Sequence, residues 1–118
     1  MATKPLEASV RQQGGVAIID LRGDIDSFGE DALYQGYAEA EAASATAVLL
    51  NFAGVDYINS TGIALIVGVL ARARKAGRRL LTTGLSSHYL EIFRITRLAD
   101  FMTIVPDEAA ALAQAAGG

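Results

Sequence analysis

The chain has 118 residues, of which 52% are hydrophobic and 19% are charged, and this balance predicts one folded domain, because disordered chains are poor in apolar residues. It contains no cysteine and one histidine, which excludes a disulfide framework, a thiolate nucleophile and a multi-histidine metal site. The net charge of −3 argues against a general nucleic-acid binder, because such proteins are usually basic.

The first third of the chain predicts an antiparallel hairpin followed by a helix. Apolar residues alternate with polar ones over residues 6–10, a glycine pair at 14–15 supplies a turn, and residues 16–21 are apolar on both faces, as in a central strand. Residues 23–27 break this pattern and predict a loop that can cap a helix. Apolar spacings of three and four then predict a helix over residues 28 to about 43.

The remaining chain alternates strands with helices. We expect these elements at residues 47–52 (strand), 60–76 (helix), 79–83 (strand), 88–95 (helix), 102–105 (strand) and from Pro106 onward (helix). The first strand is a short, nearly continuous apolar run, which is typical of a strand buried on both faces. Residues 53–59, which separate it from the next helix, are expected to form a loop.

The resulting order is ββαβαβαβα, which predicts an α/β domain with a mixed, mostly parallel sheet. Strands that alternate with helices run parallel and are joined by right-handed crossovers. Ligands and partners of such folds usually meet the loops at the carboxyl ends of the strands. In this chain those loops are expected at residues 23–27, 53–60 and 84–87.

The most unusual segment is residues 56–63, with the sequence DYINSTGI. Ser60 is expected at the beginning of a helix, beside backbone N–H groups that lack helical partners. One interpretation makes Asn59 or Ser60 an ordinary helix N-cap. The other makes Ser60 a phosphoacceptor, because a phosphoryl group would add about −1.5 to −2 charges to a surface that faces a partner.

Two short motifs resemble the STAS domain family, and in particular the bacterial anti-sigma factor antagonists. Residues 59–62 (NSTG) are similar to the D-S-[ST]-G signature of these antagonists, and residues 21–26 (LRGDID) resemble the family's second-strand motif. The spacing of the motifs, the hairpin and the element order agree with the family from about residue 6 to 115. The resemblance implies one STAS domain over residues 1–118, with the STAS fold and about four helices.

The resemblance also implies a partner switch that is not an enzyme and needs no cofactor. In the family, the unphosphorylated antagonist binds an anti-sigma factor that is also a serine kinase, and this frees a sigma factor. Phosphorylation of the signature serine, here Ser60, breaks the complex, and a PP2C-type phosphatase restores it. Asp26 matches an aspartate near the kinase contact surface. The implied partner-binding residues are Gly23, Asp24, Ile25, Asp26, Asn59, Ser60, Thr61, Gly62 and Ile63.

Asn59 departs from the family pattern, which usually has aspartate at this position. The amide removes one charge beside the phosphoacceptor but keeps an oxygen that can cap the helix, so partner choice or phosphorylation rate can differ from those of the typical member. Some relatives act instead as scaffolds in stress-signalling assemblies, and this is the alternative function. Thr83 lies where some of those relatives carry a second phosphorylated threonine, and modification of Thr61 or Thr83 is left open.

Other chemical functions lack the residues they need. A phosphoaspartate receiver requires a lysine near its last strand, but the only lysines are Lys4 and Lys75. No glycine-rich nucleotide-binding motif occurs, and His88 has no serine, cysteine or carboxylate at the spacing of a catalytic triad.

The surface and the core leave two further expectations. Five basic residues lie within eight positions, at Arg72, Arg74, Lys75, Arg78 and Arg79. They suit a solvated helix end, or they form a surface for an acidic partner or a second copy, so a homodimer remains an alternative. Phe93 and Phe101, with Ile92, Ile95 and Leu98, are expected in the core.

We expect a cytoplasmic protein without a membrane contact. The longest apolar run, residues 63–71, is about half the length of a membrane-spanning helix. The first residues lack the apolar region of a signal peptide.

Overall fold

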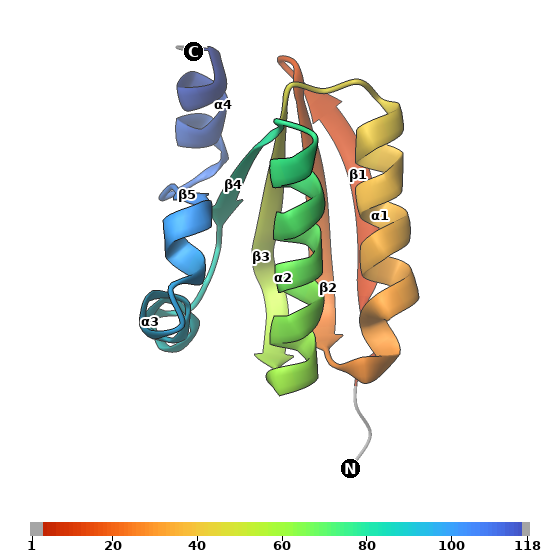
Figure 1. Cartoon of the computed structure of the whole chain (residues 1–118), viewed down its shortest axis with the longest axis vertical. Coiled ribbons are helices and arrows are strands. Elements are labelled where there is room, and N and C mark those ends of the chain that lie inside the picture. The colour runs from red at the N-terminus through yellow and green to blue at the C-terminus, as the bar shows by residue number, and fades with distance from the viewer. Residues whose placement is uncertain (1–3, 117–118) are drawn as a thin grey trace.

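The computed structural model describes residues 4–116, so Met1 and its two neighbours and residues 117–118, which the expected domain also included, lie outside the described part. The elements in chain order are β1 (Glu7–Gln13), β2 (Val16–Ile25), the 3₁₀ turn η1 (Ser27–Gly29), α1 (Glu30–Ala42), β3 (Ala47–Ile58), α2 (Ser60–Lys75), β4 (Arg79–Thr83), α3 (Ser87–Ile95), the 3₁₀ turn η2 (Leu98–Phe101), β5 (Thr103–Ile104) and α4 (Glu108–Ala116) (Figure 1). This order confirms the predicted ββαβαβαβα arrangement.

The five strands form one mixed sheet in the order β1-β2-β3-β4-β5. β1 and β2 are antiparallel, with Gln13 opposite Val16 across the Gly14-Gly15 turn. Both glycines have positive φ angles, of 59° and 81°, which a tight two-residue hairpin turn requires. The other neighbouring strands are parallel, as the strand–helix alternation predicted.

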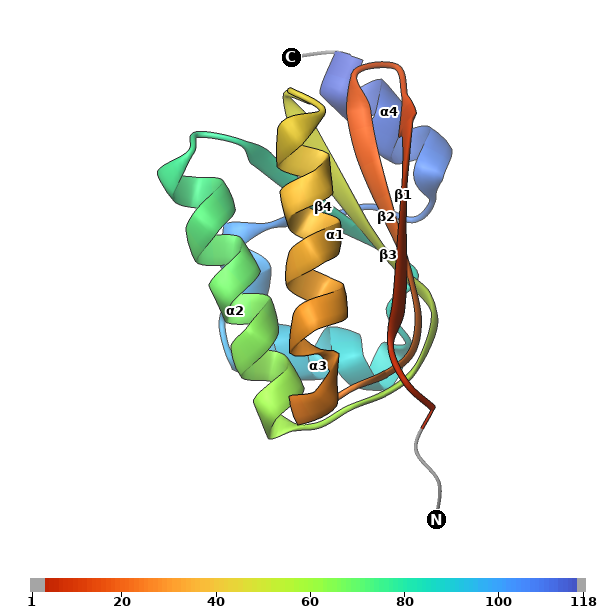
Figure 2. The ribbon, with the colours of Figure 1, turned by 90° about the vertical axis from the view of Figure 1, so that its right-hand side faces the viewer.

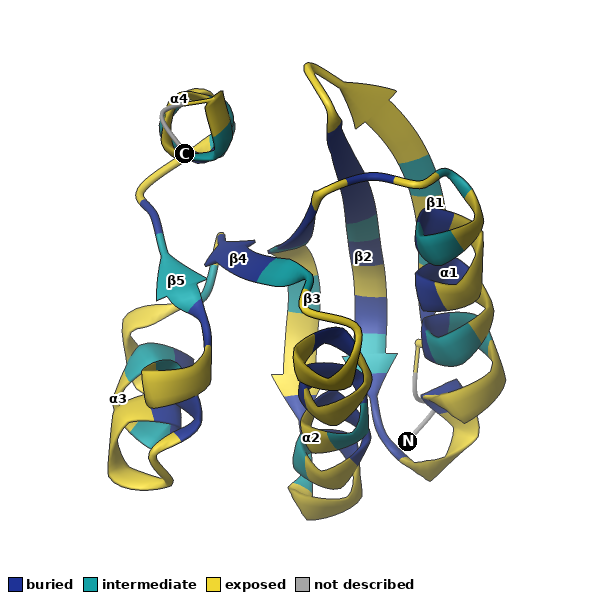
Figure 3. Ribbon diagram, turned by 45° about the horizontal axis from the view of Figure 1, so that its top comes forward, coloured by how far each residue is buried: buried dark blue, intermediate teal, exposed yellow. Residues whose placement is uncertain are grey.

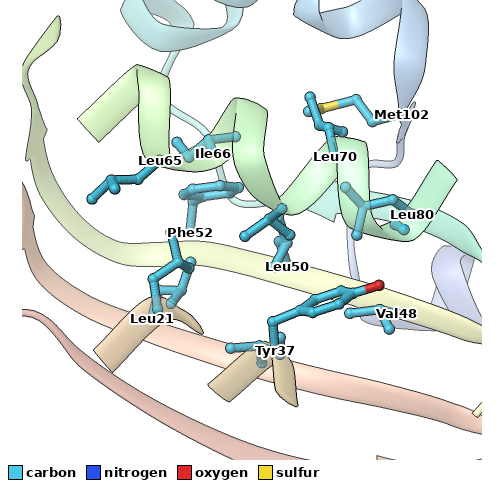
Figure 4. Close-up of a cluster of buried hydrophobic side chains, with 14 of the residues drawn as sticks. Leu21, Tyr37, Val48, Leu50, Phe52, Leu65, Ile66, Leu70, Leu80 and Met102 are labelled. Atoms are coloured by element: carbon cyan, nitrogen blue, oxygen red, sulfur yellow. The ribbon is translucent and has the colours of Figure 1, made fainter. Parts of the chain in front are cut away.

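The sheet separates two apolar layers of unequal size. α1 and α2 lie on one side of the sheet and α4 lies on the other (Figure 2). The larger layer joins α1, α2 and α3 to the sheet, and its centre contains Tyr37, Phe52 and Ile66 (Figure 4). In the smaller layer, Ala111 of α4 packs with residues of β2, β3 and β4 such as Leu49. The strands between the layers are therefore buried for much of their length (Figure 3).

β2 and β3 are both longer than the sequence predicted. Residues 23–25 and 53–58 were expected to form loops, but they continue the two strands. The strands pair with each other beyond Asp20, through register shifts, as far as Ile25 opposite Ile58. The polar residues and glycines suggested a loop because they form no continuous apolar face. Backbone pairing between β2 and β3 nevertheless keeps these residues in the strands.

Two large apolar side chains that were expected in the core are exposed, and so is Phe28, which the apolar spacing counted with the expected helix. Phe28 is 87% exposed because α1 begins only at Glu30, after the turn η1. Ile95 and Phe101 are 70% and 53% exposed, whereas Phe93 and Leu98 are buried as predicted. The expectation for Ile95 and Phe101 was wrong because Ile95 is the last residue of α3 and Phe101 the last residue of η2, and neither packs in the two apolar layers. No helix within the described part of the chain is long and apolar enough to cross a membrane.

An ionic cluster fixes α4 against the hairpin. Arg11 on β1 donates to both carboxylate oxygens of Asp20 on β2, at 2.7 and 3.2 Å, and also to Glu108 at the start of α4. The amide of Asn51 donates to Asp20 at 2.8 Å. Hydrogen bonding by Arg11 lowers the pKa of the Glu108 carboxyl, and Arg11 together with Asn51 lowers the pKa of the Asp20 carboxyl. Both carboxyl groups therefore stabilise the fold in their ionised forms.

Candidate functional site

The candidate site lies where the carboxyl ends of β2 and β3 meet the first turn of α2, at the lower end of Figure 1. The backbone N–H of Asn59 donates to the carbonyl of Ile25 at 3.2 Å. A Cβ atom on Gly62 would overlap the same carbonyl group. Glycine at this position therefore allows the first turn of α2 to lie directly against the end of β2.

Asn59 is the N-cap of α2, and Ser60 is its first helical residue. The side-chain oxygen Oδ1 of Asn59 accepts from the backbone N–H of Gly62 at 2.8 Å, and the Asn59 backbone is extended. Of the two N-cap interpretations, the structure therefore selects Asn59. Ser60 is exposed, and its hydroxyl makes no hydrogen bond to another residue in the range 4–116.

The aspartate of the second-strand motif shapes the chain rather than presenting a charge to solvent. Asp26 is 9% exposed, and its Oδ1 accepts from the backbone N–H of Phe28 at 3.0 Å. The backbone N–H of Gly29 donates to the carbonyl of Asp26 at 3.0 Å, which closes the turn η1. The turn packs against α2. Asp26 thus fixes the place from which the side chain of Phe28 projects.

The other residues of the motif hold the N-terminal segment across the end of the sheet. The backbone N–H of Asp24 donates to the carbonyl of Lys4 at 2.9 Å, and the backbone N–H of Lys4 donates to the Asp24 carboxylate at 3.2 Å. Gly23 has a φ of 103°, and a Cβ there would overlap the carbonyl of Pro5. Glycine is therefore needed at this crossing.

The structure brings the nine predicted partner-binding residues to one end of the molecule, but their exposure differs. Ser60 and Thr61 are exposed, and three residues are half-buried, namely Asp24, Asn59 and Ile63. The four others are buried: Gly23, Ile25, Asp26 and Gly62. A partner that docks here would touch the exposed residues, while the buried ones determine the shape of the surface.

Sequence reasoning did not include Phe28 and Tyr57 in this surface. Phe28 was assigned to the apolar side of the expected helix, and Tyr57 is about half exposed on β3. An aspartate two residues before Phe28 was the available signal, because an Asp side chain often accepts from the backbone two residues onward and forms a turn. Such a turn would have delayed the helix and released Phe28 from its core face.

An ion pair marks the same edge of the sheet. Lys4 Nζ lies 3.0 Å from Asp56 Oδ2, and both side chains are more than half exposed. The hydrogen bond to Asp56 raises the pKa of the Lys4 amine. An exposed pair of this kind contributes little to stability, so its main effect is to neutralise one acid of this surface.

The structure also places the remaining candidates. Thr83 lies at the end of β4 and is buried, with 7% of its surface exposed. His88 is exposed in the first turn of α3. No group of three or more histidine or acidic side chains in the described range is arranged to hold a metal ion.

Residues 8–106 match the family model described as "Mlab, STAS domain". The chain therefore belongs to the STAS domain family, which confirms the resemblance found in the sequence.

Curated relatives of the chain are named anti-sigma-B factor antagonists. The protein of that name from Listeria monocytogenes is 26% identical over 86 residues, which cover 73% of this chain and 75% of the relative. The Bacillus subtilis protein of the same name is 27% identical over 100 residues, which cover 84% of this chain and 90% of the relative.

Solved structures show the same fold. An anti-sigma factor antagonist from Mycobacterium paratuberculosis aligns with a TM-score of 0.78 at 20% identity, over 98% of this chain and 97% of that one. The antagonist SpoIIAA in its unphosphorylated form aligns with a TM-score of 0.69 at 15% identity, over 94% and 98%. The phosphorylated form of SpoIIAA, from Bacillus, aligns with a TM-score of 0.66 at 19% identity, over 88% and 96%.

Proposed function

We propose that this protein is an anti-sigma factor antagonist that switches partners through phosphorylation of Ser60. In its unphosphorylated form it binds an anti-sigma factor serine kinase, and in its phosphorylated form it is released until a PP2C-type phosphatase removes the phosphate. It acts in the cytoplasm as a regulator, not as an enzyme. The observation that carries the proposal is that Ser60 is exposed at the start of α2. Its side chain is not needed to cap the helix, because Asn59 is the N-cap.

The position of Ser60 suits a phosphoryl group in the free protein. The first turn of a helix carries a partial positive charge, which stabilises an anion there. Phosphorylation therefore need not disturb the fold, and its effect falls on the partner. A docked partner would have to desolvate about −1.5 to −2 charges or place its own acids against them.

The energy that the switch requires does not exceed the cost of burying such a charge. A hundredfold loss of affinity corresponds to about 2.8 kcal/mol. Leaving a charge buried and unpaired at an interface costs about 3–5 kcal/mol. One phosphoryl group on Ser60 is therefore enough to separate the bound and released states.

The surface around Ser60 offers a rigid contact area. Thr61 is exposed on the next position of α2, and the turn η1 beside α2 projects the ring of Phe28. Large aromatic side chains commonly provide much of the energy of protein interfaces. The kinase-binding surface that we propose consists of these residues, supported from below by Gly23, Asp24, Ile25, Asp26, Asn59, Gly62 and Ile63.

The amide of Asn59 preserves the cap while omitting a charge. Its oxygen makes the hydrogen bond that an aspartate would make. The phosphorylated protein consequently carries one negative charge fewer at this turn than a relative with aspartate. We expect this chain to select a kinase whose contact with Asn59 is a neutral hydrogen bond.

Binding of Ser60 variants to the cognate anti-sigma factor kinase tests the proposal. The wild type and Ser60→Ala are expected to bind the kinase with equal affinity in the absence of ATP, and Ser60→Asp is expected to bind at least tenfold more weakly. With ATP, the wild-type complex dissociates and the Ser60→Ala complex persists. Ser87→Ala is the matched control, because Ser87 is also an exposed first residue of a helix and lies outside the proposed surface, and its complex should dissociate like that of the wild type. Equal persistence of the wild-type and Ser60→Ala complexes with ATP would refute the switch.

A further inference from the structure

An apolar hollow lies away from Ser60, between the C-terminal half of α2 and the turn η2. Its volume is about 210 Å³, which exceeds the roughly 150 Å³ of an engineered protein cavity that binds benzene. It is lined by Val67, Leu70, Ala71, Arg74, Leu98 and Phe101. The hollow is therefore large enough for a phenyl ring, and its walls are almost entirely apolar.

The rim of this hollow is basic. The guanidinium of Arg74 lies 5.1 Å from the centre of the Phe101 ring, and Lys75 is exposed on the next position. Neither side chain makes an ion pair with another residue in the described range. Arg72 and Arg78, by contrast, both face Glu41 of the same chain. Arg79 is half-buried and donates to the carbonyl of Gln114 at 3.2 Å. Arg74 and Lys75 are thus the exposed cations of this cluster that remain available to an acidic partner.

The chain carries a matching feature at the other end of α2. Phe28 is 87% exposed and is held in the turn that Asp26 caps. Glu30 and Asp31 follow it at the start of α1 and are both exposed. Neither acid forms an ion pair within the part of the chain that the structure describes. The segment therefore presents one aromatic ring with two acids beside it.

We infer that a second copy of this chain occupies the hollow, with its Phe28 ring between α2 and η2. Its Glu30 and Asp31 then lie near Arg74 and Lys75, so apolar and charged groups match in the same contact. The two surfaces are different and lie at different ends of α2. The contact is therefore head-to-tail, and it lets copies add in series rather than closing a symmetric dimer.

This contact goes beyond the proposed switch, because self-association needs no kinase. Phe28 also belongs to the proposed kinase-binding surface, so a second copy and the kinase would compete for its ring. The contact predicts weak self-association, because one ring and two exposed ion pairs form a small interface. Salt should weaken the association, since screening reduces the attraction between exposed charges. Ser60→Ala should self-associate as the wild type does.

Sedimentation velocity of the purified full-length chain over a range of concentrations tests the inference. The wild-type average mass should rise with concentration and fall with added salt. Phe28→Ala removes the ring and Ala71→Glu blocks the hollow, and each should weaken self-association by about tenfold or more. Both positions are exposed, so circular dichroism should show intact folds. Ile95→Ala, which removes another exposed apolar side chain away from both surfaces, should associate like the wild type.

A mixture of the two variants gives the decisive result. Phe28→Ala retains the hollow and Ala71→Glu retains the ring, so the mixture should form a one-to-one dimer that neither variant forms alone. A wild type that stays monomeric at every concentration, or a mixture that forms no dimer, would overturn the inference. If Phe28→Ala loses kinase binding but the wild type shows no self-association, Phe28 serves only the kinase contact. That result would overturn the inference and leave the Ser60 switch in place.

Discussion

The cap of α2 provides the sharpest test of how Ser60 is presented. In the structure, one hydrogen bond of 2.8 Å joins the Asn59 side chain to the Gly62 N–H. Asn59→Ala removes this bond and leaves one helix-end donor without its partner, which typically costs about 1 kcal/mol, with a range of about 0.5–2 kcal/mol. Since urea m-values of small proteins are about 1–3 kcal/mol/M, the midpoint of urea unfolding should fall by roughly 0.5 M.

The aspartate variant separates the cap from the charge. Asn59→Asp keeps an oxygen acceptor and adds an anion at the helix start, which is worth about 0.3–1 kcal/mol at low salt. We therefore expect Asn59→Asp to be as stable as the wild type or slightly more stable at neutral pH, with the gain reduced by added salt. Equilibrium unfolding in urea, followed by circular dichroism, measures all three proteins.

Two outcomes would refute this account of the turn. If Asn59→Ala unfolds at the same urea concentration as the wild type, the cap does not stabilise α2. Alternatively, Asn59→Asp and Asn59→Ala could be destabilised equally, which would mean that the amide hydrogens, and not the capping oxygen, matter.

Three further predictions concern the packing, the surface and the ionic cluster. Gly62→Ala should destabilise the fold by about 1–3 kcal/mol, because the added methyl group meets the backbone at the end of β2 and α2 must shift. Thermal unfolding measures this loss, and an unchanged midpoint of unfolding would contradict the close contact. Phe28→Ala should change the stability by less than about 0.5 kcal/mol, because the ring is exposed; a larger loss in urea unfolding would mean that the ring is packed. The lowered pKa values of Asp20 and Glu108 contribute stability that is present above their unfolded-state pKa values, near 4, and is lost as the pH falls through the folded-state values. Arg11→Met should therefore reduce the loss of stability at acid pH, measured by unfolding over a range of pH. An unchanged loss at acid pH would contradict the role of the cluster.

The order of elements could be predicted from the sequence because most elements bury apolar residues at regular spacing. The alternation before Gly14 and the continuous apolar runs around Ile18 and Leu49 each matched a strand that the structure contains. The extension of β3 to Ile58 could not be predicted from the sequence. Its polar residues and Gly54 are held by pairing with β2, which is a long-range interaction that no local pattern reports.

The candidate site could be predicted only in part, because some of its geometry also depends on interactions that apolar spacing does not report. The short motif around Ser60 located the helix start, and the capping preference of asparagine agreed with the hydrogen bond that Asn59 makes. The exposure of Phe28 depends on a turn that Asp26 closes through its side chain and its carbonyl. Apolar spacing alone counted Phe28 with the helix that follows, so the periodicity gave the wrong place for the ring.

The most direct test of the central claim is peptide mass spectrometry of the protein purified from its native host, both during growth and under stress. The proposed switch predicts a phosphoryl group on Ser60, in a fraction that changes with the condition, and none on the neighbouring Thr61. A Ser60 that is unmodified under every condition, and that stays unmodified with the cognate kinase and ATP, would contradict the switch and leave Ser60 as an ordinary first residue of α2.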